Sequence, residues 1–279
     1  MANKDIAEKH FTEHNDIFCD LVNMAYFDGE PIIKPESLTD LPARQLVIRH
    51  EELRELERDV CKSCKEAHIE LAIYGLENQS QYDRFMPIRT LEYNAWCYMN
   101  QVEDIKARKR KNIVPVLTLV VSFSTKKWNK NHKLSDLLKL PENLKPYFND
   151  YKINLLELSF LSEEQIAKFK TPDMRAVAGY LRQKRLNVNY QPSTEELIHT
   201  SNVIAVIAAL NGDKDFVNVY NNLMNEGKEP KTMCEMIERI KNEARAEGEA
   251  IGKAEGLAEG LAEGEARGKA ENAMNTAKV

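Results

Sequence analysis

Apolar and polar positions follow helical spacing in some segments of the chain and strand-like spacing in others. Apolar residues at helical spacing predict an opening helix over residues 5–27, which ends at Gly29 and Pro31. The segments LERDVCKSC and AHIELAIYGLENQ predict two strands joined by the polar link KEA, and therefore a β-hairpin. Pro87 suits the first turn of a helix, so we expect the helix over IRTLEYNAWCYMNQVEDI to cover this hairpin.

Two further strands are predicted after this helix. The run IVPVLTLVVSF, residues 113–123, is apolar without alternation, which predicts a central strand buried on both faces. After two short helical pieces, YKINLLELSFL predicts a strand over residues 151–161, and a capping-box pattern from Ser162 to Gln165 begins another helix. This order of elements is typical of an α/β fold with a mixed sheet whose first strands form a hairpin.

The chain beyond about residue 172 shows only helical signals. Glycine then recurs every fourth residue, at 248, 252, 256, 260, 264 and 268. On a helix of about 3.6 residues per turn, this repeat drifts by roughly 40° per step, so the glycines trace a slow spiral. We therefore predict a main α/β domain over residues 1–185, a helical region over 186–242 and a Gly/Ala/Glu-repeat tail, helical or disordered, over 243–279.

Three interpretations of the tail remain open. It could be a solvated helix or a disordered extension, or it could pack against a second copy through its glycine and alanine face and make a homo-oligomer of the C-terminal helical region. It could also touch another protein or a membrane surface. Because only Ile251, Leu257 and Leu261 are strongly apolar, the membrane has the least support and we expect no membrane partner.

Composition and charge exclude several classes of protein. With 279 residues, 43% of them hydrophobic, and a net charge of −5, the chain is not a globally basic coat for nucleic acid, so phosphate contacts must come from local patches. No secretory signal and no run of eighteen apolar residues is found, and we expect a cytoplasmic protein. The five cysteines fit reduced thiols, and the pair Cys61 and Cys64 lacks a histidine at zinc-ligand spacing.

Polar residues stand at the ends of the predicted hairpin strands. Side chains alternate across a strand, so Glu77 and Gln79 point to the same face, and Asp59 on the neighbouring strand can join them. Two carboxylates at this separation repel one another unless a cation lies between them, and Mg²⁺ prefers carboxylate oxygens. Such a metal would polarise a phosphodiester and supply the attacking water.

The spacing of these residues resembles a nuclease signature. Asp59, seventeen intervening residues and then Glu77, Asn78 and Gln79 resemble the PD-(D/E)xK motif in the variant that ends in glutamine. The surrounding words are similar to the Rpn family of recombination-promoting nucleases, also known as PD-(D/E)xK family transposases, over roughly residues 5–185. These words are LERDV, YGLENQSQYD, MPIRTLEYNAWCY, VPVLTLVVSF and YKINLLELSFLSEEQIAKF.

The resemblance implies a restriction-endonuclease-like mixed sheet flanked by helices in residues 1–185. It implies an endonuclease that hydrolyses DNA with Mg²⁺ or another divalent cation in recombination or transposition-like DNA processing. Asp59 and Glu77 match the two metal-binding acids, and Gln79 stands where most of the superfamily has lysine. Glutamine has no ionisable amine, so it could only orient water or substrate by hydrogen bonds.

The same resemblance suggests residues on two helices. The superfamily often adds a metal-binding acid from the first helix, which Asp20 matches, with Asp16 as an alternative. After the hairpin, Arg89 and Tyr93 are four residues apart and share a helix face. Arg89 could hold the scissile phosphate of DNA, or it could form a salt bridge with Asp83 or Glu92.

Two basic segments flank the predicted central strand and could bind the DNA backbone. Lys109 and Arg110 precede the strand, and Lys126 and Lys127 follow it. They could equally be the solvated ends of ordinary elements. Trp128 could stack on a base or be a partly buried anchor.

A different class of function fits the same residues if the hairpin acids bind no metal. The chain would then be a non-catalytic α/β DNA-binding or protein-interaction scaffold with a self-associating helical tail. Metal binding discriminates the two hypotheses, because only the nuclease requires Asp59 to hold a cation.

Overall fold

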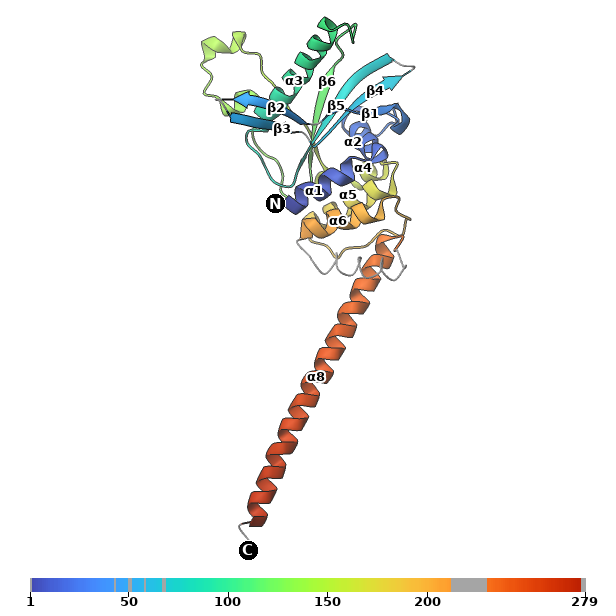
Figure 1. Cartoon of the computed structure of the whole chain (residues 1–279), viewed down its shortest axis with the longest axis vertical. Helices are drawn as coiled ribbons and strands as arrows, with labels where there is room; N and C mark the ends of the chain where they lie inside the picture. Colours follow the sequence, from blue (N-terminus) through green and yellow to red (C-terminus); the bar gives the residue numbers. More distant parts are fainter. Residues whose placement is uncertain are drawn as a thin grey trace.

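A computed structural model describes residues 2–42, 44–49, 52–57, 59–66, 69–211 and 230–276. An α/β body carries one long helix that extends away from it (Figure 1). The helices are α1 (Ala2–Thr12), α2 (Asn15–Phe27), η1 (Pro35–Ser37), α3 (Met86–Lys106), η2 (Leu134–Leu137), η3 (Glu142–Tyr147), η4 (Leu158–Phe160), α4 (Glu163–Ala167), α5 (Pro172–Leu186), α6 (Thr200–Asn211) and α8 (Met233–Thr276). The strands are β1 (Leu38–Asp40), β2 (Arg44–Arg49), β3 (Glu52–Glu57), β4 (Val60–Glu66), β5 (Ile69–Gln79), β6 (Val116–Ser122) and β7 (Asn154–Glu157).

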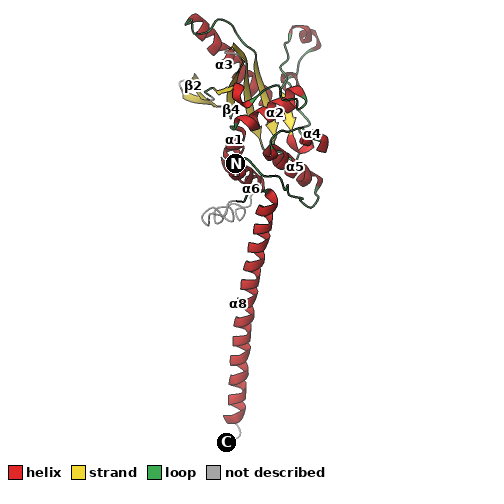
Figure 2. Cartoon of the chain, turned by 90° about the vertical axis from the view of Figure 1, so that its right-hand side faces the viewer, coloured by secondary structure: helices red, strands yellow, loops and turns green. Residues whose placement is uncertain are grey.

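The main sheet is mixed, as the sequence predicted, and lies among the helices of the body (Figure 2). Its strand order is β1-β4-β5-β6-β7. The pairs β1–β4 and β4–β5 are antiparallel, whereas β5–β6 and β6–β7 are parallel. The predicted hairpin is confirmed as β4 and β5, and Val60 pairs with Leu76. The predicted helix after the hairpin is confirmed as α3, with Pro87 in its first turn.

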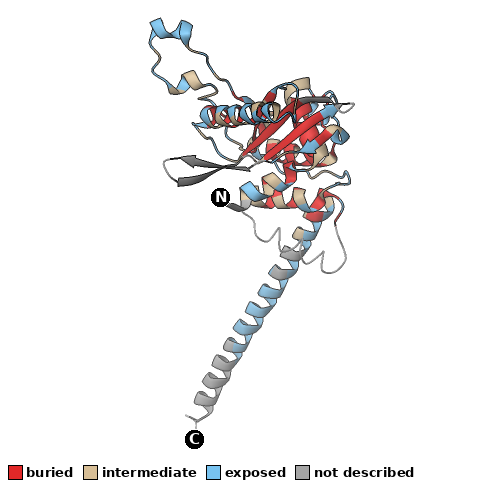
Figure 3. Cartoon of the chain, turned by 45° about the horizontal axis from the view of Figure 1, so that its top comes forward, coloured by how far each residue is buried: buried red, intermediate tan, exposed pale blue. Residues whose placement is uncertain are grey.

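Hydrophobic residues cover both faces of the sheet, and the buried residues gather there (Figure 3). On one face, Cys97 of α3 packs with Cys61, Ile73 and Val116 of the strands. On the other face, the larger cluster joins the sheet to α1, α2, α5 and α6. The buried residues of β6 divide between these faces, which explains its unbroken apolar sequence and confirms the predicted central strand.

The predicted opening helix over residues 5–27 is wrong in one respect, because it is two helices. Helix α1 ends at Thr12, whose hydroxyl donates to the Glu8 carbonyl at 2.9 Å, and His14 is extended with φ −64° and ψ 131° before α2 begins. Both halves bury apolar residues in the same cluster, so the apolar spacing hides the break. Helix α2 ends as expected near Gly29, whose φ is 83°.

Short strands escaped the sequence analysis. Between α2 and the predicted hairpin, where the sequence predicted no strand before residue 56, the structure contains η1, β1 and the two-stranded ribbon of β2 and β3. The strand predicted over 151–161 is only Asn154–Glu157, followed by the 3-10 turn Leu158–Phe160. Such short elements carry too few residues for a periodic pattern to identify them. The predicted capping box is confirmed, because Ser162 accepts from the Gln165 amide at the start of α4.

The C-terminal helices share the core of the body. Val203 and Ile207 of α6 and Met233 and Met236 of α8 belong to the same cluster as Phe11. The predicted division at residue 185 therefore runs through one hydrophobic core. Residues 212–229, within the region predicted to be helical, lie outside the described residues.

Helix α8 continues without interruption through the glycine repeat, and its described side chains between residues 245 and 264 are exposed. In the ranges that the structure describes, no helix is both long enough and apolar enough to cross a membrane.

Candidate active site between α1, β5 and α3

Asp59 lies directly before β4, and Glu77 lies on the neighbouring strand β5. Asp59 directly precedes Val60, which pairs with Leu76, so the register places Asp59 opposite Glu77. Asp59 Oδ2 accepts a hydrogen bond from the Asn78 amide at 2.7 Å. Burial raises the pKa of the Asp59 carboxyl above its ordinary value, although this amide and the nearby Lys9 and Arg89 partly offset the effect. The structure thus brings together the two acids that the sequence singled out.

Alternation along β5 separates its polar side chains. Asn78 points toward α1, where its Nδ2 donates to the Thr12 hydroxyl at 2.8 Å. Glu77 points the opposite way, toward α3. Gln79 is half-buried at the end of the strand and shares the Glu77 face by the same alternation. Asp59, Glu77 and Gln79 therefore lie at the same end of the hairpin of β4 and β5.

Arg89 of α3 connects to this end of the sheet. Its Nη2 donates to Glu77 Oε2 at 3.0 Å, and its Nη1 donates to Asp83 Oδ2 at 3.0 Å. Tyr93, one turn later, lies with its hydroxyl 3.4 Å from Nη2. Burial by itself would lower the pKa of Arg89, but the neighbouring Glu77 carboxylate raises it and the net shift is upward. Arg89 is therefore a fixed cation beside a carboxylate that is only 1% exposed.

Glu8 of α1 is a third acid near Asp59. Glu8 is 1% exposed, and neither of its carboxylate oxygens has a hydrogen-bond partner within the described part of the chain. Burial and the nearby Asp5 and Asp59 carboxylates raise the pKa of Glu8 from 4.5 to about 8. A buried carboxyl without a hydrogen bond is costly and marks a site where a ligand or proton is expected.

The sequence analysis missed Glu8, although a signal existed. Glu8, Phe11 and Thr12 follow the i, i+3, i+4 spacing of one helix face, and all three are buried. An acid on the buried face of an amphipathic helix is unusual unless it is paired or functional. The segment was interpreted only for its apolar residues, so this acid was not weighed.

Asp20 has a different environment from Asp59. It lies on α2, which, like α1, packs on the face of the sheet opposite to the one that carries Glu77. Its oxygens accept from the Thr171 hydroxyl at 2.7 Å and from the Thr171 and Lys170 amides at 2.8 and 2.9 Å. These bonds fix the segment before α5. The structure therefore does not bring Asp20 to the other acids, and Asp16 instead contacts His199 at 2.9 Å.

The basic residues predicted to bind DNA lie at two opposite ends of β6. Lys126 and Lys127 follow the strand and lie near the end of β5, where Ser122 pairs with Gln79. Lys109 and Arg110 precede the strand, and Arg110 donates to Gln101 at 3.0 Å. A strand of seven residues at about 3.3 Å per residue separates the two groups. Only Lys126 and Lys127 are placed beside the candidate active site.

Trp128 is 4% exposed and packs with Met86, Val120 and Ile153. It is therefore the buried anchor that the sequence analysis weighed against a stacking residue.

The acids of the site differ in how well they are placed to hold a metal ion. Among the described residues, no three His, Cys, Asp or Glu side chains are grouped closely enough to hold a metal ion as they stand. Asp59, just before β4, and Glu77 on β5 nevertheless place carboxylates at one end of the sheet, and Glu8 adds, from α1, a buried carboxyl that lacks a hydrogen-bond partner in the described structure. Carboxylate oxygens are the ligands that Mg²⁺ prefers, so the chemistry of these side chains suits a divalent cation.

A comparison with known protein families matches residues 37–204 to the family described as "Putative transposase, YhgA-like". The match covers more than half of the 279 residues and includes Asp59, Glu77 and Arg89, whereas Glu8 precedes it. No curated protein and no solved structure matches the chain.

Proposed function

Because the chain belongs to the family of YhgA-like putative transposases, we propose that it is a metal-dependent DNA endonuclease of the PD-(D/E)xK type. The substrate is DNA, and the reaction is hydrolysis of a phosphodiester bond during recombination or transposition-like processing. The observation that carries the proposal is the placement of Asp59 opposite Glu77, with the buried carboxyl of Glu8 beside Asp59.

Each residue of the site has a proposed task. Asp59 and Glu77 hold a divalent cation, Mg²⁺ or a similar ion, and Glu8 takes the place in the ligand set that we expected for Asp20. The cation, when bound, polarises the phosphodiester and lowers the pKa of a water molecule. Glu8 would hold a proton while the site is without metal, because a pKa of about 8 keeps it neutral at pH 7, and it would have to release that proton to join the ligand set.

Arg89 and Gln79 act on the substrate side of the site. Arg89 is held by Asp83 and Glu77, and its side chain is 39% exposed, so it can contact a phosphate without losing both anchors. Gln79 replaces the usual lysine of the superfamily and orients water or substrate by hydrogen bonds alone. It cannot supply a cation or act as a base.

A plasmid-nicking assay tests this proposal. The full chain should nick supercoiled DNA only when Mg²⁺ or Mn²⁺ is present. Asp59→Asn and Glu77→Gln should each lower the rate by at least about 100-fold, because each removes a ligand charge without a large change in volume. Glu142→Gln, on the exposed turn η3, is the matched control and should cleave like the wild type. Metal-independent cleavage, or full activity of Asp59→Asn, would contradict the proposal.

A non-catalytic DNA-binding or interaction scaffold is the second candidate. The observation that favours it is the Arg89–Glu77 ion pair, which already neutralises one of the two acids without a metal. Calorimetric titration with Mg²⁺ separates the candidates. Heat of binding that disappears in Asp59→Asn supports the nuclease. A protein that shifts DNA in a gel and neither binds metal nor cuts DNA is the scaffold.

A further inference from the structure

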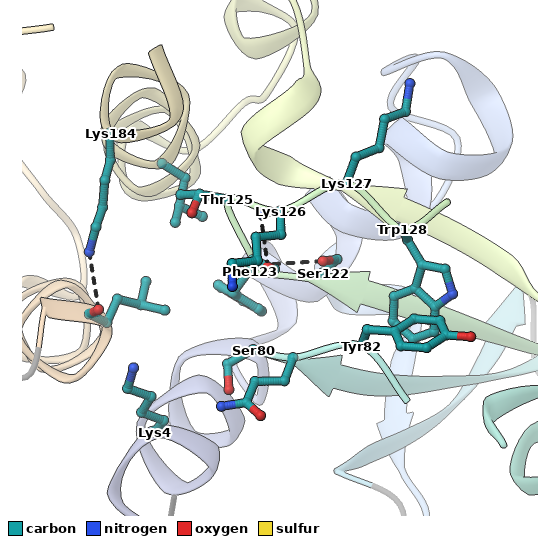
Figure 4. A pocket seen from close by; sticks show the side chains of 14 residues that line it. Lys4, Ser80, Tyr82, Ser122, Phe123, Thr125, Lys126, Lys127, Trp128 and Lys184 are labelled. Carbon is teal, nitrogen blue, oxygen red and sulfur yellow. Dashed lines mark hydrogen bonds between the residues drawn. The ribbon is translucent and has the colours of Figure 1, made fainter. Parts of the chain in front are cut away.

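A cleft of about 520 Å³ adjoins the candidate active site at the ends of β5 and β6 (Figure 4). Ser80, on its wall, directly follows Gln79. Lys4, on another wall, lies one helical turn before Glu8 and is close enough to lower the pKa of that carboxyl. The cleft and the acids therefore share both α1 and β5.

Lysines from different elements surround one end of the cleft. Lys4 of α1, Lys126 after β6 and Lys184 of α5 extend toward one another, whereas Lys127 points away (Figure 4). The described lining contains no acidic residue. Lys184 Nζ is fixed by donating to the Leu210 carbonyl at 3.1 Å and to Asn211 Oδ1 at 2.7 Å. Like charges held together without a carboxylate favour a bound anion such as phosphate.

An aromatic side chain stands at the other end of the cleft. Tyr82 is 47% exposed and packs edge to face against the buried Trp128, with ring centroids 5.0 Å apart. Its hydroxyl accepts a hydrogen bond from Asn131 Nδ2, so the ring is held from two sides. A fixed and exposed aromatic ring is a platform on which a nucleobase can stack. The hydroxyls of Ser80 and Ser124 line the space between the two ends.

We propose that this cleft binds one unpaired nucleotide of a DNA strand next to the scissile bond. The phosphate lies among Lys4, Lys126 and Lys184, and the base stacks on Tyr82. The volume of the cleft is in the range of small-ligand sites, about 300–1,000 Å³. A DNA duplex, whose major groove alone is about 12 Å wide, is too large to enter such a site. This inference rests on the proposed function for its substrate, DNA, and assigns single-stranded or frayed DNA as the preferred form.

Fluorescence anisotropy of the full chain in EDTA tests the inference without cleavage. The probes are a single-stranded thymidine oligonucleotide of about twelve nucleotides and a hairpin duplex of similar charge. The single strand should bind at least about tenfold tighter than the duplex. Tyr82→Ala should weaken single-strand binding by about tenfold, while Tyr82→Phe, which keeps the ring, should retain it. Lys126→Gln should weaken single-strand binding, and Lys130→Gln, exposed and outside the cleft lining, should not.

Three results would overturn the inference. Equal affinity for single strand and duplex would show that the protein binds the DNA backbone through a general basic surface. Unchanged single-strand binding by both Tyr82→Ala and Lys126→Gln would show that the cleft is not the site. Competition by thymidine monophosphate at the concentration at which the oligonucleotide itself competes would assign the cleft to a free nucleotide.

The inference and the proposed function fail separately. Cleft-dependent binding of single strands by a protein that never cuts DNA would reject the nuclease and retain the cleft. Metal-dependent cleavage by a protein whose single-strand binding is unchanged by these substitutions would retain the nuclease and reject the cleft.

Discussion

Arg89 Nη2 lies 3.0 Å from Glu77 Oε2, and this contact joins the first turn of α3 to the end of β5. Glu77 is 1% exposed, whereas Arg89 is 39% exposed, so the carboxylate depends on the guanidinium for compensation of its charge. Because Glu77 is also a proposed metal ligand, Arg89 and a bound metal ion would compete for its carboxylate.

We predict that Arg89→Ala lowers the free energy of unfolding by about 1–3 kcal/mol in the absence of metal, because a buried carboxylate loses its charged partner. Mg²⁺ should then raise the melting temperature of Arg89→Ala more than that of the wild type, since the ion replaces the lost charge. Thermal denaturation with and without Mg²⁺ measures both effects. Arg84→Ala, on the turn before α3, is the control. An equal response of wild type and Arg89→Ala to Mg²⁺ would argue against Glu77 as a ligand.

The raised pKa of Glu8 predicts a pH-dependent stability. Folding raises this pKa from 4.5 to about 8, so the folded chain keeps a proton that the unfolded chain releases. The contribution of Glu8 is fully present below pH 4.5 and is lost as the pH rises to about 8. One unit of pKa shift corresponds to about 1.4 kcal/mol, so we expect a loss of a few kcal/mol over this window.

Glu8→Gln should remove this pH dependence, because glutamine stays neutral. Urea denaturation at several pH values across the window measures the difference, and Glu164→Gln on the exposed side of α4 is the control. Parallel stability curves for wild type and Glu8→Gln would show that Glu8 does not hold the proton.

Gln79→Lys should retain or increase cleavage, because it restores the cation that most of the superfamily carries at this position. The nicking rate in Mg²⁺ measures the effect. Gln81→Lys, two residues further along the chain, controls for an added charge that merely attracts DNA. Complete loss of cleavage in Gln79→Lys would count against the assigned equivalence of this position.

Asp20→Asn should destabilise the fold and leave metal binding intact. The carboxylate holds Thr171 and the Lys170 amide, and loss of charged hydrogen bonds costs about 1–3 kcal/mol. The midpoint of urea denaturation should fall, while the Mg²⁺ affinity from calorimetry should equal that of the wild type. A folded Asp20→Asn protein that no longer binds Mg²⁺ would restore Asp20 to the metal site.

Deletion of residues 243–279 should leave the melting transition of the body nearly unchanged. Met233 and Met236, which α8 contributes to the core, remain in the truncated chain, and the described side chains beyond them, from residue 245 to 264, are exposed. If the glycine spiral lets two helices approach closely, the truncation should shift the protein from dimer to monomer in sedimentation. Unchanged sedimentation would reject self-association through the tail, and lost cleavage would show that the catalytic unit extends into it.

The sequence by itself determined the hairpin, the doubly buried strand β6 and the shared end of Asp59 and Glu77. Each depends on a strong local pattern. Side chains alternate along a strand, and the short link between β4 and β5 pairs them as a hairpin. Sequence spacing brings Asp59 and Glu77 to the same end of this hairpin, but the register shift between Cys64 and Lys65 is what sets Asp59 opposite Glu77.

Only the tertiary structure decided which helical acid reaches this site. Glu8 and Asp20 both lie on N-terminal helices, but the break at His14 gives α1 and α2 different directions. Asp20 then accepts a hydrogen bond from Thr171, whereas Glu8 lies close enough to Asp59 for that carboxylate to raise its pKa. The cleft depends on the same kind of long-range packing, since Lys4, Lys126 and Lys184 come from elements far apart in the chain. Local periodicity specifies the face on which a side chain lies, and the packing of whole elements specifies what that face meets.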